Sequence, residues 1–457
     1  MRPTHSKDFV SWFRSAAPWL YAFRGKTFVV AFGGELLDMP GRIEALTQDI
    51  NLLIALGIRV VVVHGTRSQI EAELNKAGLK TISHRGNRVT TPEALDCVKR
   101  AVGAIRLDFE ALFSFGLPNT PMAQSEGVRL VSGSFVTAQP IGVIDGVDFQ
   151  FTGKVRDIDA QTIHHALDNG DIVLLSPMGF SPTGETFNLN FEEVATSAAI
   201  ALDAEKLIFL IDAPGLPLPV ARKRTKASKG ATIARELSAK EAEEMFRTAM
   251  SDLHRLNLTD DTLRALDSAV RASKGSVART HLIDRNVDGA CLLELFSYNG
   301  IGTMITEASL DQLREATIDD VGGVLQLIEP LELDGTLVRR GRELIEREIS
   351  QFAVLEHDGV AAGCAALYPF PKEEMAEMAC FVVSPEYRGH NYGERLLAHI
   401  EAKARAQKIK QLFVLTTRTG HWFIEHGFAP QDLTALPAQK QALYNFQRGS
   451  KIFVKKL

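Results

Sequence analysis

Cysteine is scarce in this sequence. The four cysteines, Cys97, Cys291, Cys364 and Cys380, are scattered without a Cys-x-x-Cys pair or a nearby histidine cluster. Such spacing does not match a zinc site, and four cysteines in 457 residues are too few for the disulfide framework of a secreted protein. We therefore expect no metal cofactor and a reduced, cytoplasmic setting.

An excess of basic charge and a long apolar run are also missing. Lys and Arg number 51 against 56 Asp and Glu, for a formal charge of -5, so nucleic acid is not an expected partner. No segment approaches the roughly 20 apolar residues that span a bilayer, which excludes an integral membrane protein. The apolar segment 9–20 is interrupted by Arg14 and Pro18. It predicts an amphipathic helix that packs on the body or on another subunit, and not a signal peptide.

Short β-branched runs indicate a parallel sheet in the first part of the chain. They lie at 27–32, 59–64, 171–175 and 206–211, and a helical pattern at 43–56 separates the first two. Continuous apolar runs of this kind are typical of parallel strands buried on both faces. The expected fold is α/β, an open three-layer αβα domain with a mainly parallel sheet.

The length of the chain predicts more than one domain. The stretch 306–312 is polar and without pattern. We therefore expect an interface helix at 1–24, the α/β domain at 25–302, a linker at 303–312 and a smaller α+β domain at 313–457. Thr317 or Asp319 is placed to cap the first helix of that second domain.

A phosphate-binding turn is predicted in the second domain. The apolar strand 378–383 leads through small and polar residues at 388–393 into a helix marked by Leu396, Leu397 and Ile400. Unpaired N–H groups and the helix dipole attract anions at such a point. The alternative is an ordinary strand–turn–helix corner.

The turn Arg388-Gly-His-Asn-Tyr-Gly393 resembles the Gln/Arg-x-x-Gly-x-Gly/Ala motif of the GNAT acyltransferase superfamily. Asn391 replaces the first glycine, and Asn tolerates left-handed backbone angles. The resemblance implies acetyl-CoA as co-substrate. In such enzymes a strand edge pairs with the pantetheine amides and polarises the thioester carbonyl. The implied cofactor contacts are Cys380, Phe381, Val382, Arg388, Gly389, His390, Asn391, Tyr392, Gly393 and Glu394.

The first domain resembles acetylglutamate kinase, of the amino-acid kinase superfamily. The likeness lies in 28–34, 63–67, 188–190 and the helix 192–202. Those kinases carry Lys two residues before the paired glycines, where this chain has Ala31, and their His-Gly-Gly-Gly turn is His64-Gly-Thr-Arg67 here. Phosphoryl transfer depends on fixed positive charge. Loss of kinase activity is expected, and the alternative is a distant kinase that uses another lysine, such as Lys26.

A kinase-like domain joined to a GNAT domain resembles the N-acetylglutamate synthase family over nearly the whole chain. The resemblance implies acetyl transfer to L-glutamate, the first step of arginine biosynthesis, with L-arginine as a feedback effector of the first domain. It also implies a homo-oligomer held by the kinase-like domain and the N-terminal helix. The matching regulatory residues are Glu294, Gly300 and Gly302. A carboxylate in an apolar helix suits a guanidinium, although Glu294 alone also fits a surface position.

Acetylation of an amino acid needs a base, because the amine is largely ammonium near neutral pH. Glu377 is the candidate, just before the strand 378–383, since an apolar setting makes a carboxylate a better proton acceptor. The resemblance assigns the same role to the glutamate of Glu-x-x-Cys. A solvated acidic loop at 372–377 is the alternative. Thr416 is expected to hydrogen-bond the leaving sulfur, because Phe423 replaces the Tyr that serves many GNAT enzymes.

Glutamate brings two carboxylates, so its pocket should be cationic. By resemblance, the acceptor contacts are Arg340, Cys380, Lys440, Arg448 and Ser450. Lys440 stands where relatives commonly carry Arg, and a lysine lacks the planar fork of a guanidinium. Two alternative functions remain, a GNAT enzyme for another amine, whose pocket should be acidic, and a residual acetylglutamate kinase.

Overall fold

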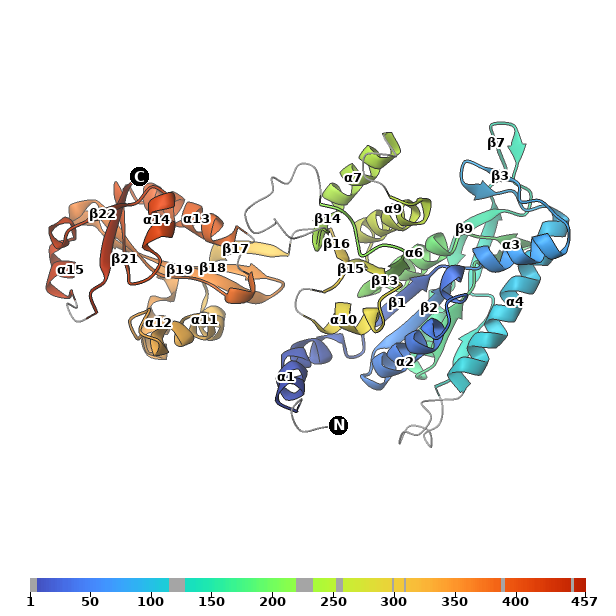
Figure 1. Cartoon of the computed structure of the whole chain (residues 1–457), viewed down its shortest axis with the longest axis horizontal. Coiled ribbons are helices and arrows are strands. Elements are labelled where there is room, and N and C mark those ends of the chain that lie inside the picture. Colours follow the sequence, from blue (N-terminus) through green and yellow to red (C-terminus); the bar gives the residue numbers. More distant parts are fainter. Residues whose placement is uncertain are drawn as a thin grey trace. The chain divides into compact units, whose positions relative to one another are not determined.

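The computed structural model describes residues 6–114, 128–218, 233–251, 258–297, 300–307, 310–387, 391–444 and 448–457. These residues form two compact units that divide near residue 308 (Figure 1). Among them, no helix is long and apolar enough to cross a membrane.

The first unit is built on an eight-stranded sheet with the order β14-β16-β15-β13-β1-β2-β10-β5. Neighbouring strands are parallel except β15 and β16, as the apolar runs predicted. The strands are β1 Thr27–Phe32, β2 Arg59–His64, β5 Leu130–Ser132, β10 Ile172–Leu175, β13 Lys206–Ile211, β14 Glu236–Ser238, β15 Arg279–Asp284 and β16 Thr303–Thr306.

Helices cover both faces of this sheet, which makes the three layers (Figure 1). Successive side chains of β1 point to opposite faces. Phe28, Val30 and Phe32 pack with α1 Ser6–Phe23, α2 Arg42–Ala55, α4 Pro92–Ser114 and α10 Ala290–Phe296. Val29 and Ala31 pack with α5 Ala160–Asp168, α6 Phe191–Ala201, α7 Ala239–Ser251 and α9 Asp260–Lys274.

Smaller elements complete the first unit. Helix α3 Arg67–Lys76 packs against α4. A four-stranded sheet contains β12 Thr186–Asn188, β11 Met178–Phe180, β6 Val136–Pro140 and β9 Gly153–Ile158. Two hairpins are formed by β3 Ser83–His84 with β4 Asn87–Arg88, and by β7 Val143–Ile144 with β8 Val147–Asp148.

The second unit is a seven-stranded, mainly antiparallel sheet with the order β17-β18-β19-β20-β21-β23-β22. Its strands are β17 Asp311–Glu315, β18 Phe352–His357, β19 Val360–Phe370, β20 Met375–Val383, β21 Gln411–Thr416, β22 Ala429–Gln431 and β23 Lys451–Lys456. One face packs on α11 Val321–Leu333 and α12 Arg342–Glu348, and the other on α13 Tyr392–Ala406 and α14 Gly420–Glu425 (Figure 1). The short helix α15 Ala438–Ala442 precedes β23.

The division between the units falls inside the segment predicted as a linker. Most of that segment is strand, however, since β16 belongs to the first sheet and β17 to the second. Thr317 does cap the start of the second unit's first helical turn, where Asp320 accepts hydrogen bonds from the backbone N–H and the hydroxyl of Thr317.

Strands β20 and β21 diverge in the middle of the second sheet. Their parallel pairing covers only Met375 to Glu377 against Gln411 to Phe413. Beyond Glu377, β20 has no strand partner on its β21 side among the described residues. A bulge interrupts the β19–β20 ladder, where Cys380 has a φ of +48°. The backbone of β20 is therefore open along one edge, next to the bulge.

Candidate functional site

The start of α13 has the predicted shape. Asn391 is the residue that precedes the helix, and its φ of +62° lies in the left-handed region expected for it. Gly393 and Glu394 follow in the first turn, so their N–H groups lie among the unpaired donors of the helix N-terminus. Arg388, Gly389 and His390 lie outside the described residues.

Tyr392, predicted as a cofactor contact, directs its hydroxyl into the protein. The hydroxyl donates to Oδ1 of Asp311 at 2.6 Å, an oxygen that also lies 2.7 Å from Nδ1 of His357. Arg395 pairs with the same carboxylate. Burial works to raise the pKa of Asp311, but the hydrogen bonds from His357, Tyr392 and Arg395 prevail and lower it to about 2. The side chain of Tyr392 thus anchors α13 to β17.

Cys380 lies at the bulge of β20 and is 2% exposed. Burial raises the pKa of its thiol to about 11, so the thiol is protonated at neutral pH and is a poor nucleophile. Its carbonyl oxygen accepts a contact from Sγ of Cys364 at 3.5 Å. The ring of Phe381 is tilted against that of Trp422, with ring centroids 5.2 Å apart, and Val382 is buried. These residues offer backbone groups along the open edge of β20.

Glu377 lies within β20, not in a loop before it. It is 5% exposed, and its neighbours across the sheet are Tyr368 on β19 and Phe413 on β21. This burial rules out the solvated acidic loop. Its Oε2 lies 2.5 Å from Nζ of Lys440 and forms an ion pair with it. The angles at this contact do not meet those of a hydrogen bond.

Arg340 and Arg448 belong to the same charged cluster. Burial works to lower the pKa of Arg340, but the nearby Cys380, Tyr368 and Glu377 raise it overall. Burial, and then the positive charge of Arg340, lower the pKa of Arg448, which donates to the carbonyl oxygen of Thr336. Three cations, Arg340, Arg448 and Lys440, therefore lie around the buried carboxylate of Glu377.

The two hydroxyl groups predicted for this site are both nearly buried. Ser450 is 6% exposed and directly precedes β23. Thr416 is 9% exposed and ends β21. Its hydroxyl accepts from the backbone N–H groups of Arg418 and Thr419, and lies 2.9 Å from the hydroxyl of Thr419.

Sequence reasoning missed Tyr368 and Glu348. Tyr368 pairs with Glu377 across β19 and β20, and its hydroxyl donates to Oε2 of Glu348 at 2.9 Å. Burial raises the pKa of Tyr368. Only the register of β19 against β20 shows that Tyr368 is a neighbour of the candidate base, and no short motif encodes that register.

In the first unit, the three predicted regulatory residues come together. Glu294 is 8% exposed on α10, which rules out the surface position. Its Oε2 accepts from the N–H groups of Ile301 and Gly302 at 2.6 and 2.8 Å, and its Oε1 lies 2.7 Å from Nδ1 of His281. Gly300 has a φ of +56°, and a Cβ there would lie 2.6 Å from Oε2 of Glu294.

The electrostatics of Glu294 favour a fixed negative charge. Burial works to raise its pKa, but the hydrogen bonds from His281 and the backbone lower it to about 2. Two further residues that the sequence did not reveal complete the group. Nε2 of His281 lies 3.4 Å from Nζ of Lys206, which is 2% exposed and sits 4.9 Å from the ring centroid of Phe23.

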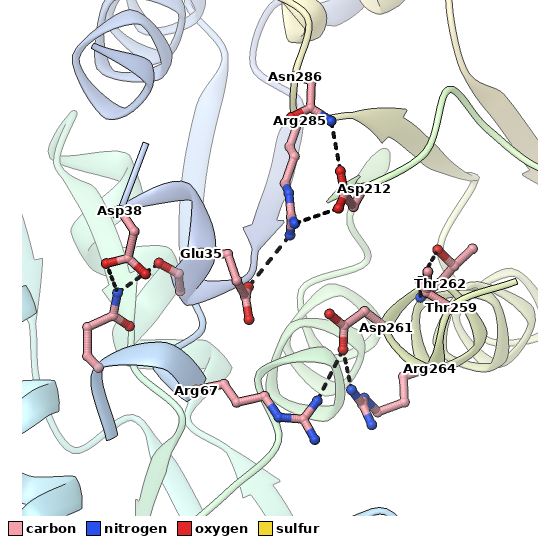
Figure 2. A network of polar contacts seen from close by, with 12 residues as sticks. Glu35, Asp38, Arg67, Asp212, Thr259, Asp261, Thr262, Arg264, Arg285 and Asn286 are labelled. Atoms are coloured by element: carbon pink, nitrogen blue, oxygen red, sulfur yellow. Dashed lines mark hydrogen bonds and ion pairs between the residues drawn. The ribbon is translucent and has the colours of Figure 1, made fainter. Parts of the chain in front are cut away.

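The cleft that corresponds to a kinase site is lined by ion pairs. Gly33, Gly34 and Gly65 line a cavity of about 160 Å³. Figure 2 shows Arg67 and Arg264 on Asp261, and Arg285 between Asp212 and Glu35. Each of these arginines already has a carboxylate partner, so a polyphosphate would have to displace those carboxylates.

Lys26 cannot replace the missing kinase lysine. It precedes the first residue of β1, pairs with Glu205 at 3.4 Å, and lies at the opposite end of the strand from Gly33 and Gly34. A strand of this length spans roughly 20 Å. Ala31, the position of the missing lysine, is fully buried.

No cluster of three or more His, Cys, Asp or Glu that could hold a metal ion occurs among the described residues.

Comparisons with known proteins match both units. Residues 26–284 match the amino acid kinase family, and residues 324–428 match the acetyltransferase (GNAT) family. An amino-acid acetyltransferase of Ralstonia nicotianae is 51% identical over 451 residues, which cover 99% of this chain and 96% of the relative. One from Pseudomonas putida is 47% identical over 450 residues, covering 98% of this chain and all of the relative.

Two solved structures match the whole chain. The N-acetylglutamate synthase of Neisseria gonorrhoeae, complexed with coenzyme A and L-arginine, has a TM-score of 0.84 and 39% identity. The alignment covers 98% of this chain and 99% of that one. The same protein with coenzyme A and N-acetyl-glutamate gives a TM-score of 0.59 with equal coverage.

Proposed function

Because the chain belongs to the amino-acid acetyltransferase family, we propose that it transfers acetyl from acetyl-CoA to the amino group of L-glutamate. This reaction is the first step of arginine biosynthesis. One observation carries the choice of acceptor. The buried Glu377 lies in a cluster with Arg340, Lys440 and Arg448, next to the open edge of β20. An enzyme for a polyamine or a protein lysine would need an acidic pocket there.

The residues present can perform direct transfer. Glu377 takes a proton from the ammonium of glutamate, and the freed amine attacks the thioester carbonyl carbon. The new C–N bond forms, the C–S bond breaks, and the thiolate leaves with the electron pair. The second amine proton goes to the thiolate, next to which we place the hydroxyl of Thr416. Cys380 stays protonated, so no acyl-cysteine is needed.

Acetyl-CoA binding is assigned to two backbone features. The open edge of β20 at Cys380 to Val382 pairs with the amides of pantetheine, and the start of α13 from Asn391 to Glu394 receives the pyrophosphate. The bulge at Cys380 turns N–H groups toward the thioester oxygen, where they stabilise negative charge as it develops.

The acceptor is tested by thiol release from acetyl-CoA over a panel of amines. We expect glutamate to be the best substrate, well ahead of glycine and lysine. Equal rates for the three amino acids would refute the assigned acceptor. Incubation with ATP and N-acetylglutamate tests for residual kinase activity, and we expect no ADP because Ala31 replaces the lysine.

We further propose that L-arginine binds to the first unit at Glu294 and lowers acetyl transfer. The carboxylate is fixed, ionised and adjacent to Gly300 and Gly302, and the gonococcal relative is a complex with L-arginine. Inhibition requires arginine to bind one conformation better than another. Calorimetry and rate measurements with arginine test both parts, and the absence of binding heat would refute the assignment.

Helix α1 is proposed as an interface between copies of the chain. Phe9, Trp12 and Phe13 are 46 to 61% exposed, while Phe23 packs 5.9 Å from Phe296 of α10. The helix therefore offers an apolar face next to the helix that carries Glu294. Light scattering of Phe9→Asp against the unaltered chain should show a smaller assembly. We place the enzyme in the cytoplasm, and the four buried free thiols support that setting.

A further inference from the structure

The ion pair between Lys440 and Glu377 raises a chemical problem for the proposed base. Nζ of Lys440 lies 2.5 Å from Oε2 of Glu377, whose side chain is 7% exposed. The ammonium of Lys440 therefore occupies one of the two carboxylate oxygens that could receive a proton from the substrate. In this structure the base is held by a lysine.

Lys440 has the freedom to leave. Its side chain is 26% exposed, and it extends from a five-residue helix that begins after Pro437. Lysine has a flexible four-carbon stem, and its ammonium can point in several directions without loss of geometry. Glu377 is held in the interior of β20 and cannot follow it.

The charges of glutamate match those needed for an exchange of partners. Its α-ammonium can take the place of the ammonium of Lys440 beside Glu377. Its second carboxylate then offers Lys440 a new partner, while Arg340 and Arg448, which belong to the same cluster, can contact the first. Glu377 and Lys440 each keep a partner of opposite charge throughout, which lowers the cost of moving buried charge.

We propose that Lys440 blocks the base, Glu377, until the side-chain carboxylate of glutamate draws Lys440 away. We call this blocking ion pair the latch. The site thus becomes active only for an acceptor that carries a second carboxylate. This inference rests on the proposed function and deepens it, because it assigns selectivity to the rate of the reaction as well as to binding. Lys440 acts as a positioning and specificity residue, and Glu377 remains the base.

Glutamine is the matched probe, since it has the shape of glutamate with a neutral amide at the end of its side chain. The unaltered enzyme should acetylate glutamine with a much lower kcat than glutamate. In Lys440→Gln, kcat for glutamine should rise about tenfold, while KM for glutamate also rises. Lys440→Arg keeps the cation against Glu377, so its kcat for glutamine should stay low.

Arg448→Gln is the control for loss of a cation that does not hold the base. It should raise KM for glutamate without any gain in kcat for glutamine. A simple carboxylate contact at Lys440 predicts the same pattern for Lys440→Gln, and that result would overturn the latch. Binding of coenzyme A by each variant shows that the fold is intact.

A second measurement does not depend on the variants. A crystal structure of the unaltered enzyme with coenzyme A and N-acetylglutamate should show Nζ of Lys440 on a ligand carboxylate and away from Glu377. An ion pair that persists in this complex would also overturn the latch. If the unaltered enzyme acetylates neither glutamate nor glutamine, the proposed function itself is wrong, which is a different outcome.

Discussion

The two units each bury one glutamate at the centre of a proposed site, and the surroundings of these glutamates differ. Glu294 accepts from two backbone N–H groups and contacts His281. Its contacts come from fixed elements, and they favour the charged form so strongly that its pKa falls to about 2. Among the described residues, Glu377 has one ion-pair partner, Lys440, on a flexible side chain. A carboxylate held by the backbone suits ligand binding, whereas one held by a movable cation can exchange protons.

The largest expected effect tests the proton-accepting side of this comparison. Glu377→Gln should lower kcat about a thousandfold with little change in KM for glutamate, because the amide cannot accept a proton. Initial rates of thiol release measure both constants. Glu373→Gln changes an exposed acid in the preceding turn and serves as the control. A loss of glutamate affinity with kcat preserved would mean that Glu377 only binds the substrate.

A smaller effect is expected on the ligand-binding side. Glu294→Gln should weaken arginine binding about 30-fold or more, because a buried, hydrogen-bonded charge partner typically contributes about 2 kcal/mol or more. Titration calorimetry measures the change, and Glu244→Gln on the exposed face of α7 is the matched control. Unchanged arginine affinity would show that arginine does not bind at Glu294, and the proposed contrast between the two glutamates would be wrong.

The third expected effect is on stability and not on activity or binding, and it depends on pH. The pKa of Glu294 is about 2 in the fold against 4.5 for an unperturbed glutamate, so its stabilisation is complete above pH 4.5 and is lost as the pH falls toward 2. At about 1.4 kcal/mol per unit, this loss is about 3 to 4 kcal/mol. Urea unfolding of the unaltered chain and of Glu294→Gln across this range should converge at low pH. Parallel curves would show that the hydrogen bonds do not favour the charged form.

Continuous apolar runs predicted the central strands of the first sheet, because parallel strands buried on both faces leave a strong local pattern. Strand β1 begins and ends where its sequence indicated, at Thr27 and Phe32. The segment 303–312 was harder to interpret, since β16 and β17 are short strands whose partners lie far along the chain. Pairing of that kind is decided by tertiary contacts and leaves little local signal.

The residues of the candidate sites also divide into those that were expected from the sequence and those whose contacts depend on the folded sheet. Asn391 in its left-handed conformation follows from local sequence, because a turn is a local feature. The burial of Glu294 was expected only from the family resemblance, since the pattern of its helix alone favoured a surface position. Sequence did not show that Tyr368 lies opposite Glu377, or that Lys440 contacts it. Both contacts join elements that only the folded sheet brings together.

The chain leaves the first sheet after Thr306 and enters the second at Asp311. The carboxylate of Asp311 holds Tyr392 and Arg395, in the opening turn of α13. Asp311 therefore fixes the opening turn of α13, the turn to which we assign the coenzyme's pyrophosphate, from the first strand of the same sheet. Loss of that carboxylate would leave the turn without its anchor on the sheet.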